Sequence, residues 1–272
     1  MRRRILCHEL VFFSCIPRRR MYSMKSSFFQ GFSLKGAIGR LIYAASRLVC
    51  LGVAKSLWRL RVEGRECIPR TGPAIVAANH VSYLDPIIIG VAIRRPVRFM
   101  AKGELFRFRP LGWLLRQYQV FPVDRRRSDR QALNRAIFLL QQGEIVVIFP
   151  EGTRGDGSRL GPAKPGIALI AARTGAPVIP AFHCGTEKVL PRGAWFPRPH
   201  RITVTFGGPL RFADGQTGER QRQVVAFSQT IMERIAALRS RPEGSGGQSD
   251  DRAHVATDAM PAETRGIKGE KG

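Results

Sequence analysis

The sequence predicts an α/β fold in which a mixed, largely parallel sheet is flanked by helices. Short apolar runs alternate with helical segments from about residue 61, as in strands joined by helical crossovers. Six such runs are predicted to be buried strands: 74–78, 97–101, 120–123, 144–150, 177–182 and 201–207. The clearest helix between them is 128–143, where apolar residues keep helical spacing at Leu133, Ala136, Ile137 and Leu140.

The 272 residues, 44% of them hydrophobic, suffice for one domain with a sizeable core. We expect this α/β domain to cover 61–240 and to end with a helix near 219–239. Residues 241–272 have few large apolar side chains and predict a disordered tail. Residues 1–28 are a basic extension, either disordered or lying in front of the true start.

The net charge limits the kinds of partner, and the cysteine content indicates the redox compartment. Lys and Arg number 45 against 20 Asp and Glu, so the net charge of +25 predicts an anionic partner. Nucleic acid, an acidic lipid surface, phosphorylated substrates and an acidic carrier protein all fit this charge. Nucleic acid is not expected, because no recognisable binding module is present and the aromatic residues lie in apolar runs. The five scattered cysteines form no CxxC pair, which indicates a reducing compartment.

Residues 29–60 predict amphipathic helices, either one helix or a helical pair. Basic side chains fall within about a third of the helical circumference, and the rest of the segment is mostly apolar. These basic residues are Arg40, Arg47, Lys55 and Arg59. The pattern favours a segment lying in a membrane interface, and the alternative is a helix packed on its own domain. We therefore expect a peripheral or monotopic protein at the cytoplasmic face of the cell membrane, with its depth of insertion left open.

Three polar residues, Asn79, His80 and Asp85, follow the strand predicted at 74–78. In open α/β sheets the carboxyl ends of strands are where ligands bind. A turn through residues 81–83 would bring Asp85, at the start of the next helix, back to His80. Asp85 would then fix the tautomer of His80, whose other ring nitrogen could take a proton from a hydroxyl. The alternative is a helix cap beside a satisfied buried histidine.

A second polar segment follows the strand that ends at Pro150. It contains Glu151, Gly152, Thr153 and Arg154. Glycines allow a ligand to approach the backbone closely, and arginine can hold a phosphate through paired hydrogen bonds. No P-loop or dinucleotide pattern is present, and an ordinary surface turn is the alternative.

Further basic residues follow two other predicted strands, 97–101 and 120–123. They are Lys102, Arg125, Arg126 and Arg127, and they could add to an anion site at the same sheet edge or form a solvated charge run. No GxSxG elbow, HExxH motif or metal-binding Cys/His cluster occurs, so no metal or cofactor is expected. His183 and Cys184 are adjacent on a predicted strand, so their side chains point to opposite faces and a nucleophile–base pair is not expected.

Four motifs in this order resemble those of the glycerolipid acyltransferase family, which includes 1-acyl-glycerol-3-phosphate acyltransferases. They are NHVSYLD at 79–85, VFPVDR at 120–125, FPEGTR at 149–154 and VIP at 178–180. NHxxxxD alone is a weak pattern, but with an unchanged FPEGTR behind it the match is specific. The resemblance covers roughly 40–240 and does not extend to either end of the chain.

The resemblance implies that His80 deprotonates an acceptor hydroxyl, which attacks an acyl thioester directly, while Asp85 orients His80. It implies substrate contacts at Asn79, Lys102, Arg125, Glu151, Gly152, Thr153, Arg154 and Pro180. The implied acceptor is the lysophospholipid 1-acyl-glycerol-3-phosphate, giving phosphatidic acid, and the donor is acyl-carrier protein or acyl-CoA. Another lysolipid, such as lyso-ornithine lipid, is the alternative acceptor. A non-catalytic membrane-binding protein is a remote alternative.

Overall fold

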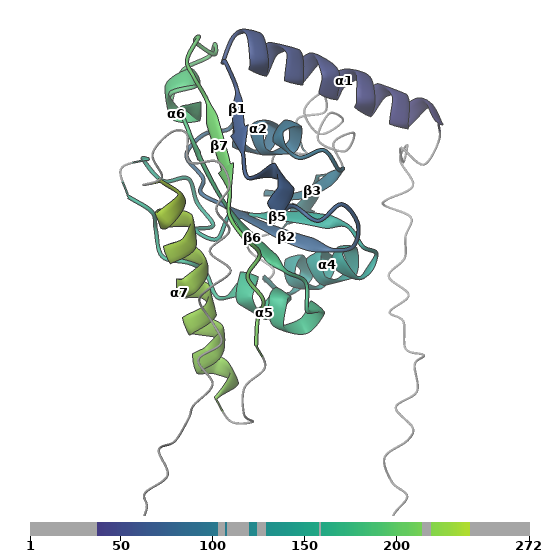
Figure 1. Cartoon of the computed structure of the whole chain (residues 1–272), viewed down its shortest axis with the longest axis vertical. Coiled ribbons are helices and arrows are strands. Elements are labelled where there is room, and N and C mark those ends of the chain that lie inside the picture. The colour runs from purple at the N-terminus through teal and green to yellow at the C-terminus, as the bar shows by residue number, and fades with distance from the viewer. Residues whose placement is uncertain are drawn as a thin grey trace, which may run out of the picture.

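The computed structural model describes residues 37–102, 107, 120–123, 129–157, 159–213 and 219–239. Its centre is a seven-stranded sheet with the order β1-β7-β6-β2-β5-β3-β4, covered by helices on both faces (Figure 1). The strands are β1 Arg61–Glu63, β2 Ala74–Ala78, β3 Val97–Lys102, β4 Phe121–Val123, β5 Ile145–Ile148, β6 Val178–Cys184 and β7 Thr203–Phe206.

Five neighbouring strands, from β6 through β2, β5 and β3 to β4, run parallel. β7 is antiparallel to β6, and β1 is parallel to β7. The predicted mixed, largely parallel sheet is therefore confirmed. The carboxyl ends of the five parallel strands lie at one edge of the sheet, which we call the carboxyl edge. Because β7 and β1 run the other way, both begin at this edge.

Two hydrophobic cores lie on opposite faces of the sheet. One contains α1 (Ala37–Ser56) and α2 (Asp85–Ala92), and the other contains α4 (Asp129–Gln141), α5 (Gly166–Thr174) and α7 (Arg220–Arg239). Side chains of β2 alternate between them: Val76 joins the first core and Ile75 the second. β2 is buried along its whole length, which explains why it reads as a continuous apolar run.

All six predicted strands are present, with ends that differ by up to two residues. The predicted helices at 128–143 and 219–239 correspond to α4 and α7. The prediction missed short elements whose patterns are weak: β1, α5, the one-turn α6 (Thr186–Val189) and the 3-10 turn η2 (Arg65–Cys67). Within the predicted 29–60 segment, residues from Ala37 to Ser56 form one helix. The predictions for 1–28 and 241–272 lie outside the described residues.

The turn between β1 and η2 requires a glycine. Gly64 has a φ of 66°, and a Cβ there would overlap the backbone carbonyl oxygen of Phe206 on β7. Gly64→Ala therefore adds a clash to the cost of the left-handed conformation, which is about 1–2 kcal/mol by itself. We expect urea unfolding to show that Gly64→Ala lowers the free energy of unfolding by clearly more than this amount.

Gly72→Ala provides the matched control. Gly72 has a φ of 76°, but a Cβ there meets no atom within 4 Å, so the variant has the backbone strain without the clash. Equal losses of unfolding free energy in the two variants would contradict the close approach of β1 to β7.

Candidate active site

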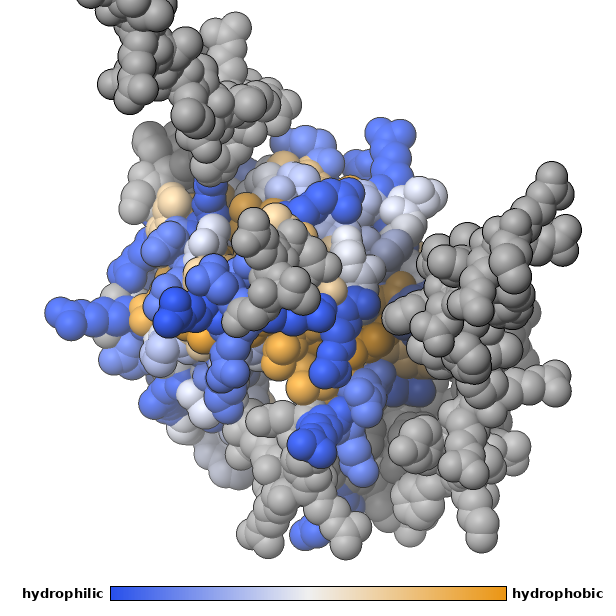
Figure 2. Space-filling model, turned by 90° about the horizontal axis from the view of Figure 1, so that it is seen from below, coloured by the Kyte–Doolittle hydropathy of each residue, from blue (hydrophilic) through white to orange (hydrophobic). Residues whose placement is uncertain are grey.

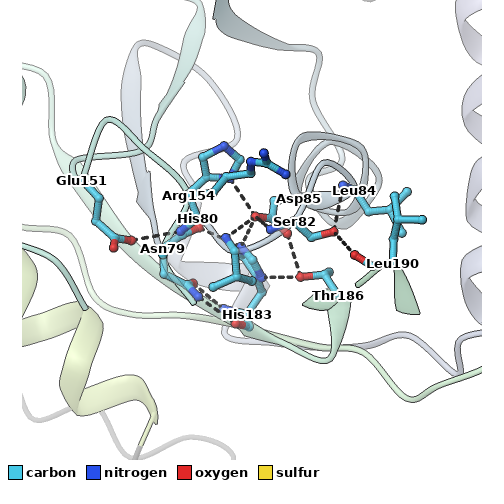
Figure 3. Close-up of polar contacts among 12 residues, drawn as sticks. Asn79, His80, Ser82, Leu84, Asp85, Glu151, Arg154, His183, Thr186 and Leu190 are labelled. Carbon is cyan, nitrogen blue, oxygen red and sulfur yellow. Dashed lines mark hydrogen bonds and ion pairs between the residues drawn. The ribbon is translucent and has the colours of Figure 1, made fainter. Parts of the chain in front are cut away.

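His80 and Asp85 meet at the carboxyl edge, two residues beyond the end of β2 (Figure 3). The His80 Nδ1 lies 2.8 Å from the Asp85 Oδ2. The same oxygen accepts hydrogen bonds from the backbone N–H groups of Val81, at 2.7 Å, and Ser82, at 2.8 Å. The chain thus turns around the carboxylate, which confirms the predicted return of Asp85 to the imidazole.

The local sequence favours this turn. Pro86 lies in the first turn of α2, where its missing N–H has no intrahelical partner to lose. Ser82 Oγ accepts from the Leu84 N–H at 3.3 Å and donates to the Leu190 carbonyl at 3.4 Å. Asp85 is the first residue of α2, and its carboxylate faces back to the preceding turn.

The second oxygen of Asp85 is bound from a distant part of the chain. Thr186, at the start of α6, donates its hydroxyl to Asp85 Oδ1 at 2.7 Å. The His183 Nε2 lies 3.7 Å from Asp85 Oδ2, and both side chains are fully buried. β6 and α6 therefore complete the surroundings of the carboxylate.

Asp85 is ionised at neutral pH. Burial is the strongest influence and raises the pKa of its carboxyl, but several opposing interactions outweigh it. The nearby His183 ring and hydrogen bonds from His80, the Ser82 N–H and Thr186 together hold this pKa below its ordinary value of 3.8. A carboxylate can only accept, so the Nδ1 of His80 carries the proton. In the neutral ring the lone pair then lies on the Nε2 of His80, whose side chain is 19% exposed.

Asn79 joins β2 to β6. Its amide donates to the His183 carbonyl and accepts from the His183 N–H, both at 2.9 Å. The His183 Nε2 is 2.8 Å from the Asn79 carbonyl oxygen. Asn79 is buried, and both ends of its side chain are used between strands. The structure thus gives Asn79 a bridging role between β2 and β6, and the substrate contact implied by the resemblance stays a prediction.

The FPEGTR segment braces the His80 backbone. Glu151 accepts the His80 N–H with Oε1, at 3.1 Å, and the Gly161 N–H with Oε2, at 3.0 Å. The Gly155 N–H donates to the His80 carbonyl at 2.8 Å. Gly152 has a φ of 71°, and the side chain of Lys164 lies where a Cβ would be. The predicted loop and the predicted base are thus one hydrogen-bonded unit.

Two contacts with aromatic rings fix the His80 imidazole and the Arg154 guanidinium. The His80 ring stacks on Phe149, with centroids 4.2 Å apart, so the imidazole plane is held. The guanidinium carbon of Arg154 lies 3.6 Å from the centroid of the Tyr83 ring. Arg192 donates to the carbonyls of Arg154, at 2.9 Å, and Gly155, at 2.7 Å. Arg154 is therefore held beside His80 by its neighbours, and the exposed Thr153 lies in the same loop.

Of the remaining predicted substrate contacts, Pro180 lies apart from this group, and the side chains of Lys102 and Arg125 lie outside the description. Pro180 is buried in β6 beside Ala77, on the face of Gly207 and Leu238, away from His80. Lys102 ends β3, and its side chain lies outside the description. Arg125, with Arg126 and Arg127, lies outside the described residues.

Sequence reasoning missed Thr186, Lys164 and Arg192, and it did not connect His183 with Asp85. One signal could have found Thr186 and His183, because both lie at the carboxyl end of a strand next to β2. No group of three His, Cys, Asp or Glu side chains in the described part of the chain is placed to hold a metal ion.

Comparisons with known proteins identify the family of the chain. A family model described as Acyltransferase matches residues 59–183, which contain both His80 and Asp85. A 1-acyl-sn-glycerol-3-phosphate acyltransferase of Bacillus subtilis is 31% identical over 197 residues, which cover 71% of this chain and 96% of the relative. A chloroplastic 1-acyl-sn-glycerol-3-phosphate acyltransferase of Brassica napus is 36% identical over 140 residues, 50% of this chain and 40% of the relative. The chain thus spans about two fifths of that plant protein.

A solved structure is similar as well. The crystal structure of the 1-acyl-sn-glycerophosphate (LPA) acyltransferase PlsC from Thermotoga maritima superposes with a TM-score of 0.58 at 26% identity. The match covers 75% of this chain and 82% of that chain. The fold and the motifs are those of an acyltransferase. The chain belongs to the acyltransferase family that contains these 1-acyl-sn-glycerol-3-phosphate acyltransferases.

Thr186→Val tests the surroundings of Asp85. The variant leaves Asp85 Oδ1 without its 2.7 Å hydrogen bond, and bonds to charged groups contribute about 1.5–3 kcal/mol. We expect a loss of this size in the unfolding free energy at pH 7. Thr186→Ser keeps the hydroxyl and should lose much less.

The pH dependence has a definite sign. The pKa of Asp85 is lowered in the folded protein, so its stabilisation is complete above the ordinary value of 3.8 and is lost as the pH falls below it. Without Thr186 this pKa rises. The gap between Thr186→Val and the native protein should therefore shrink below about pH 4. A gap that stays constant with pH would show that the hydroxyl does not act on the carboxylate.

Proposed function

We propose that the chain transfers a fatty acyl group from acyl-carrier protein or acyl-CoA to the free hydroxyl of 1-acyl-glycerol-3-phosphate, giving phosphatidic acid. The observation that carries this proposal is the buried Asp85 carboxylate 2.8 Å from the Nδ1 of a partly exposed His80, with Arg154 beside it. The names of the relatives support the acceptor, and the donor follows from the thioester chemistry implied by the motifs.

His80 is the proposed general base. Its Nε2 takes the proton of the acceptor hydroxyl as the oxygen attacks the thioester carbonyl. The new C–O bond replaces the C–S bond, and the departing thiolate takes the proton back from His80. Asp85 holds the tautomer and balances the positive charge that the ring acquires during the reaction. No acyl-enzyme is needed, because the acceptor oxygen is itself the nucleophile.

Arg154 is the proposed holder of the acceptor phosphate. Its guanidinium lies on the Tyr83 ring beside His80, and such a planar group can bind a phosphate through two parallel hydrogen bonds. Lys164 and Arg192 add positive charge to the same loop. Glu151 and Gly152 shape this loop, and we propose that they act on the acceptor through it. The concentration of cations favours a phosphate over the head group of lyso-ornithine lipid.

We propose that the helix α1 binds the membrane surface. Its outward face is apolar, with exposed Leu41, Leu48 and Val49, while Ala54 packs inward, as does Trp58 just after the helix. Arg47 turns back and donates to the carbonyls of two residues at the end of α2, Val91 at 3.3 Å and Ile93 at 2.7 Å. The predicted basic stripe therefore does not serve the membrane alone, because Arg47 binds α1 to its own domain.

The distribution of apolar surface supports α1 as the side of the protein that faces the membrane. The face opposite α1 is mostly hydrophilic where it is coloured, with a limited apolar area near its centre (Figure 2). None of the described helices combines the length and apolar character needed to span a bilayer. We therefore propose peripheral attachment through α1 to an anionic membrane surface on the cytoplasmic side.

His80→Ala should lower turnover about 10²–10⁴-fold, since general-base catalysis contributes that much. The assay offers lysophosphatidic acid and lyso-ornithine lipid separately, each with acyl-carrier-protein and CoA thioesters. Circular dichroism checks that the variant is folded. Product from lysophosphatidic acid that is lost in His80→Ala supports the base and the acceptor together.

The other outcomes are equally informative. Product from lyso-ornithine lipid alone would keep the mechanism and exclude the proposed acceptor. Turnover in a folded His80→Ala at the native rate would remove His80 from the mechanism. Absence of product with every pair of substrates would favour the non-catalytic membrane-binding alternative.

Arg154→Ala should raise the KM for the acceptor about tenfold to a hundredfold, the range expected for lost hydrogen bonds to a charged group. Arg154→Lys should restore little, because an ammonium cannot form the paired bonds. Arg222→Ala is the matched control, since Arg222 is an exposed arginine on α7. Full restoration by lysine would argue against paired phosphate binding, and an unchanged KM in Arg154→Ala would exclude Arg154 from the acceptor site.

A further inference from the structure

The segment between α6 and β7, residues 190–202, carries two large side chains that the proposed mechanism does not use. Trp195 is 92% exposed and Phe196 is 82% exposed. No other large apolar side chain in the described part of the chain is as exposed as these two. Adjacent aromatic residues in open water are unfavourable, and such apolar exposure marks an interaction site.

The base of this segment is fixed to the active site. The Leu190 carbonyl accepts from Ser82, and Arg192 donates to the carbonyls of Arg154 and Gly155. The backbone N–H of Arg198 closes the segment by donating to the Val189 carbonyl at 2.7 Å. Trp195 and Phe196 are therefore held out from the carboxyl edge by a closed and hydrogen-bonded base.

The end of the segment lies beside the end of α1. The Ile202 N–H donates to the Trp58 carbonyl, and the Arg61 N–H donates to the Ile202 carbonyl, both at 2.9 Å. In Figure 1 the connection after α6 and the end of α1 that leads to β1 both lie at the top of the molecule. The aromatic pair and the apolar face of α1 thus belong to the same end of the protein.

Charge on this end favours an anionic lipid surface. Residues 190–202 contain three arginines and no Asp or Glu, and residues 37–60 contain four basic and no acidic residues. Basic side chains near an anionic bilayer each contribute to attraction, and aromatic rings favour the level of the head groups. An acidic protein would explain the arginines but not two outward apolar rings beside a helix with an apolar outer face.

We propose that Trp195 and Phe196 form a second membrane contact, inserting into the interfacial region of an anionic bilayer beside α1. With two contacts the orientation of the protein is fixed, and the carboxyl edge with His80 faces the lipid. This inference rests on the membrane association proposed above for α1, but not on the proposed reaction. A lipid acceptor could then reach His80 without crossing water.

Vesicle co-sedimentation tests the proposal directly. The full chain is mixed with vesicles of phosphatidylcholine containing phosphatidylglycerol, and the Trp195→Ser/Phe196→Ser variant is compared with the native protein. Because burying an aromatic side chain contributes strongly to affinity, we expect the partition coefficient to fall about tenfold or more. Phe138→Ser is the matched control, since Phe138 is exposed on α4 and should not affect binding.

Fluorescence locates the contact. The signal of Trp195 is the difference between the native protein and Trp195→Phe, and it should shift to shorter wavelength with anionic vesicles. Lipids brominated on their acyl chains should quench it. The measurement is repeated with His80→Ala, which is expected to bind normally, so a failure of the proposed reaction does not affect the result.

Two results would overturn the proposal. The first is native vesicle binding in the double variant, with no change in the Trp195 signal. The second is native vesicle binding together with a higher KM for acyl-carrier-protein thioester alone. That result would assign the aromatic pair to the carrier protein instead of the membrane.

Discussion

The active site depends on one buried charge, the carboxylate of Asp85. A carboxylate without access to water is unfavourable unless its oxygens are hydrogen-bonded, and here three groups donate to Oδ2 and one to Oδ1. These donors come from the turn after β2, from His80 and from α6. The need to satisfy the carboxylate therefore shapes the turn, joins α6 to α2 and orients the imidazole. Structure and chemistry share the same set of hydrogen bonds.

The FPEGTR segment shows how one short motif supports several parts of the site. Phe149 holds the plane of the His80 ring, Glu151 holds the His80 backbone, and Arg154 supplies the nearby cation. Successive residues of a loop can point in different directions, so one strand end can support both the proposed base and the proposed anion site. The resemblance implied an acceptor contact for Glu151, and the geometry shows a brace between the two loops.

The sequence predicted the fold well where a strand is buried along its whole length. β2 and β5 are fully buried, so their apolar runs are unmistakable, whereas β1 has three residues and half-exposed side chains. The His80–Asp85 pair was also predictable, because its members are five residues apart and one turn joins them. Thr186 was not predictable in this way, since it lies 101 residues from Asp85 and only the β2–β6 pairing brings it there. Asn79 belongs to the motif, but its role between strands depends on that same pairing.

The reversal of β7 connects the active site to the proposed membrane face. Crossover helices in a parallel sheet return the chain to the amino edge, so a fully parallel sheet would begin its strands far from His80. Because β7 is antiparallel to β6, the chain between them stays at the carboxyl edge, where Arg192 binds the Arg154 loop. Because β1 is parallel to β7, α1 reaches the same edge. One antiparallel pairing thus brings α1, the aromatic pair and His80 to the same edge of the sheet, which is the edge that we propose faces lipid.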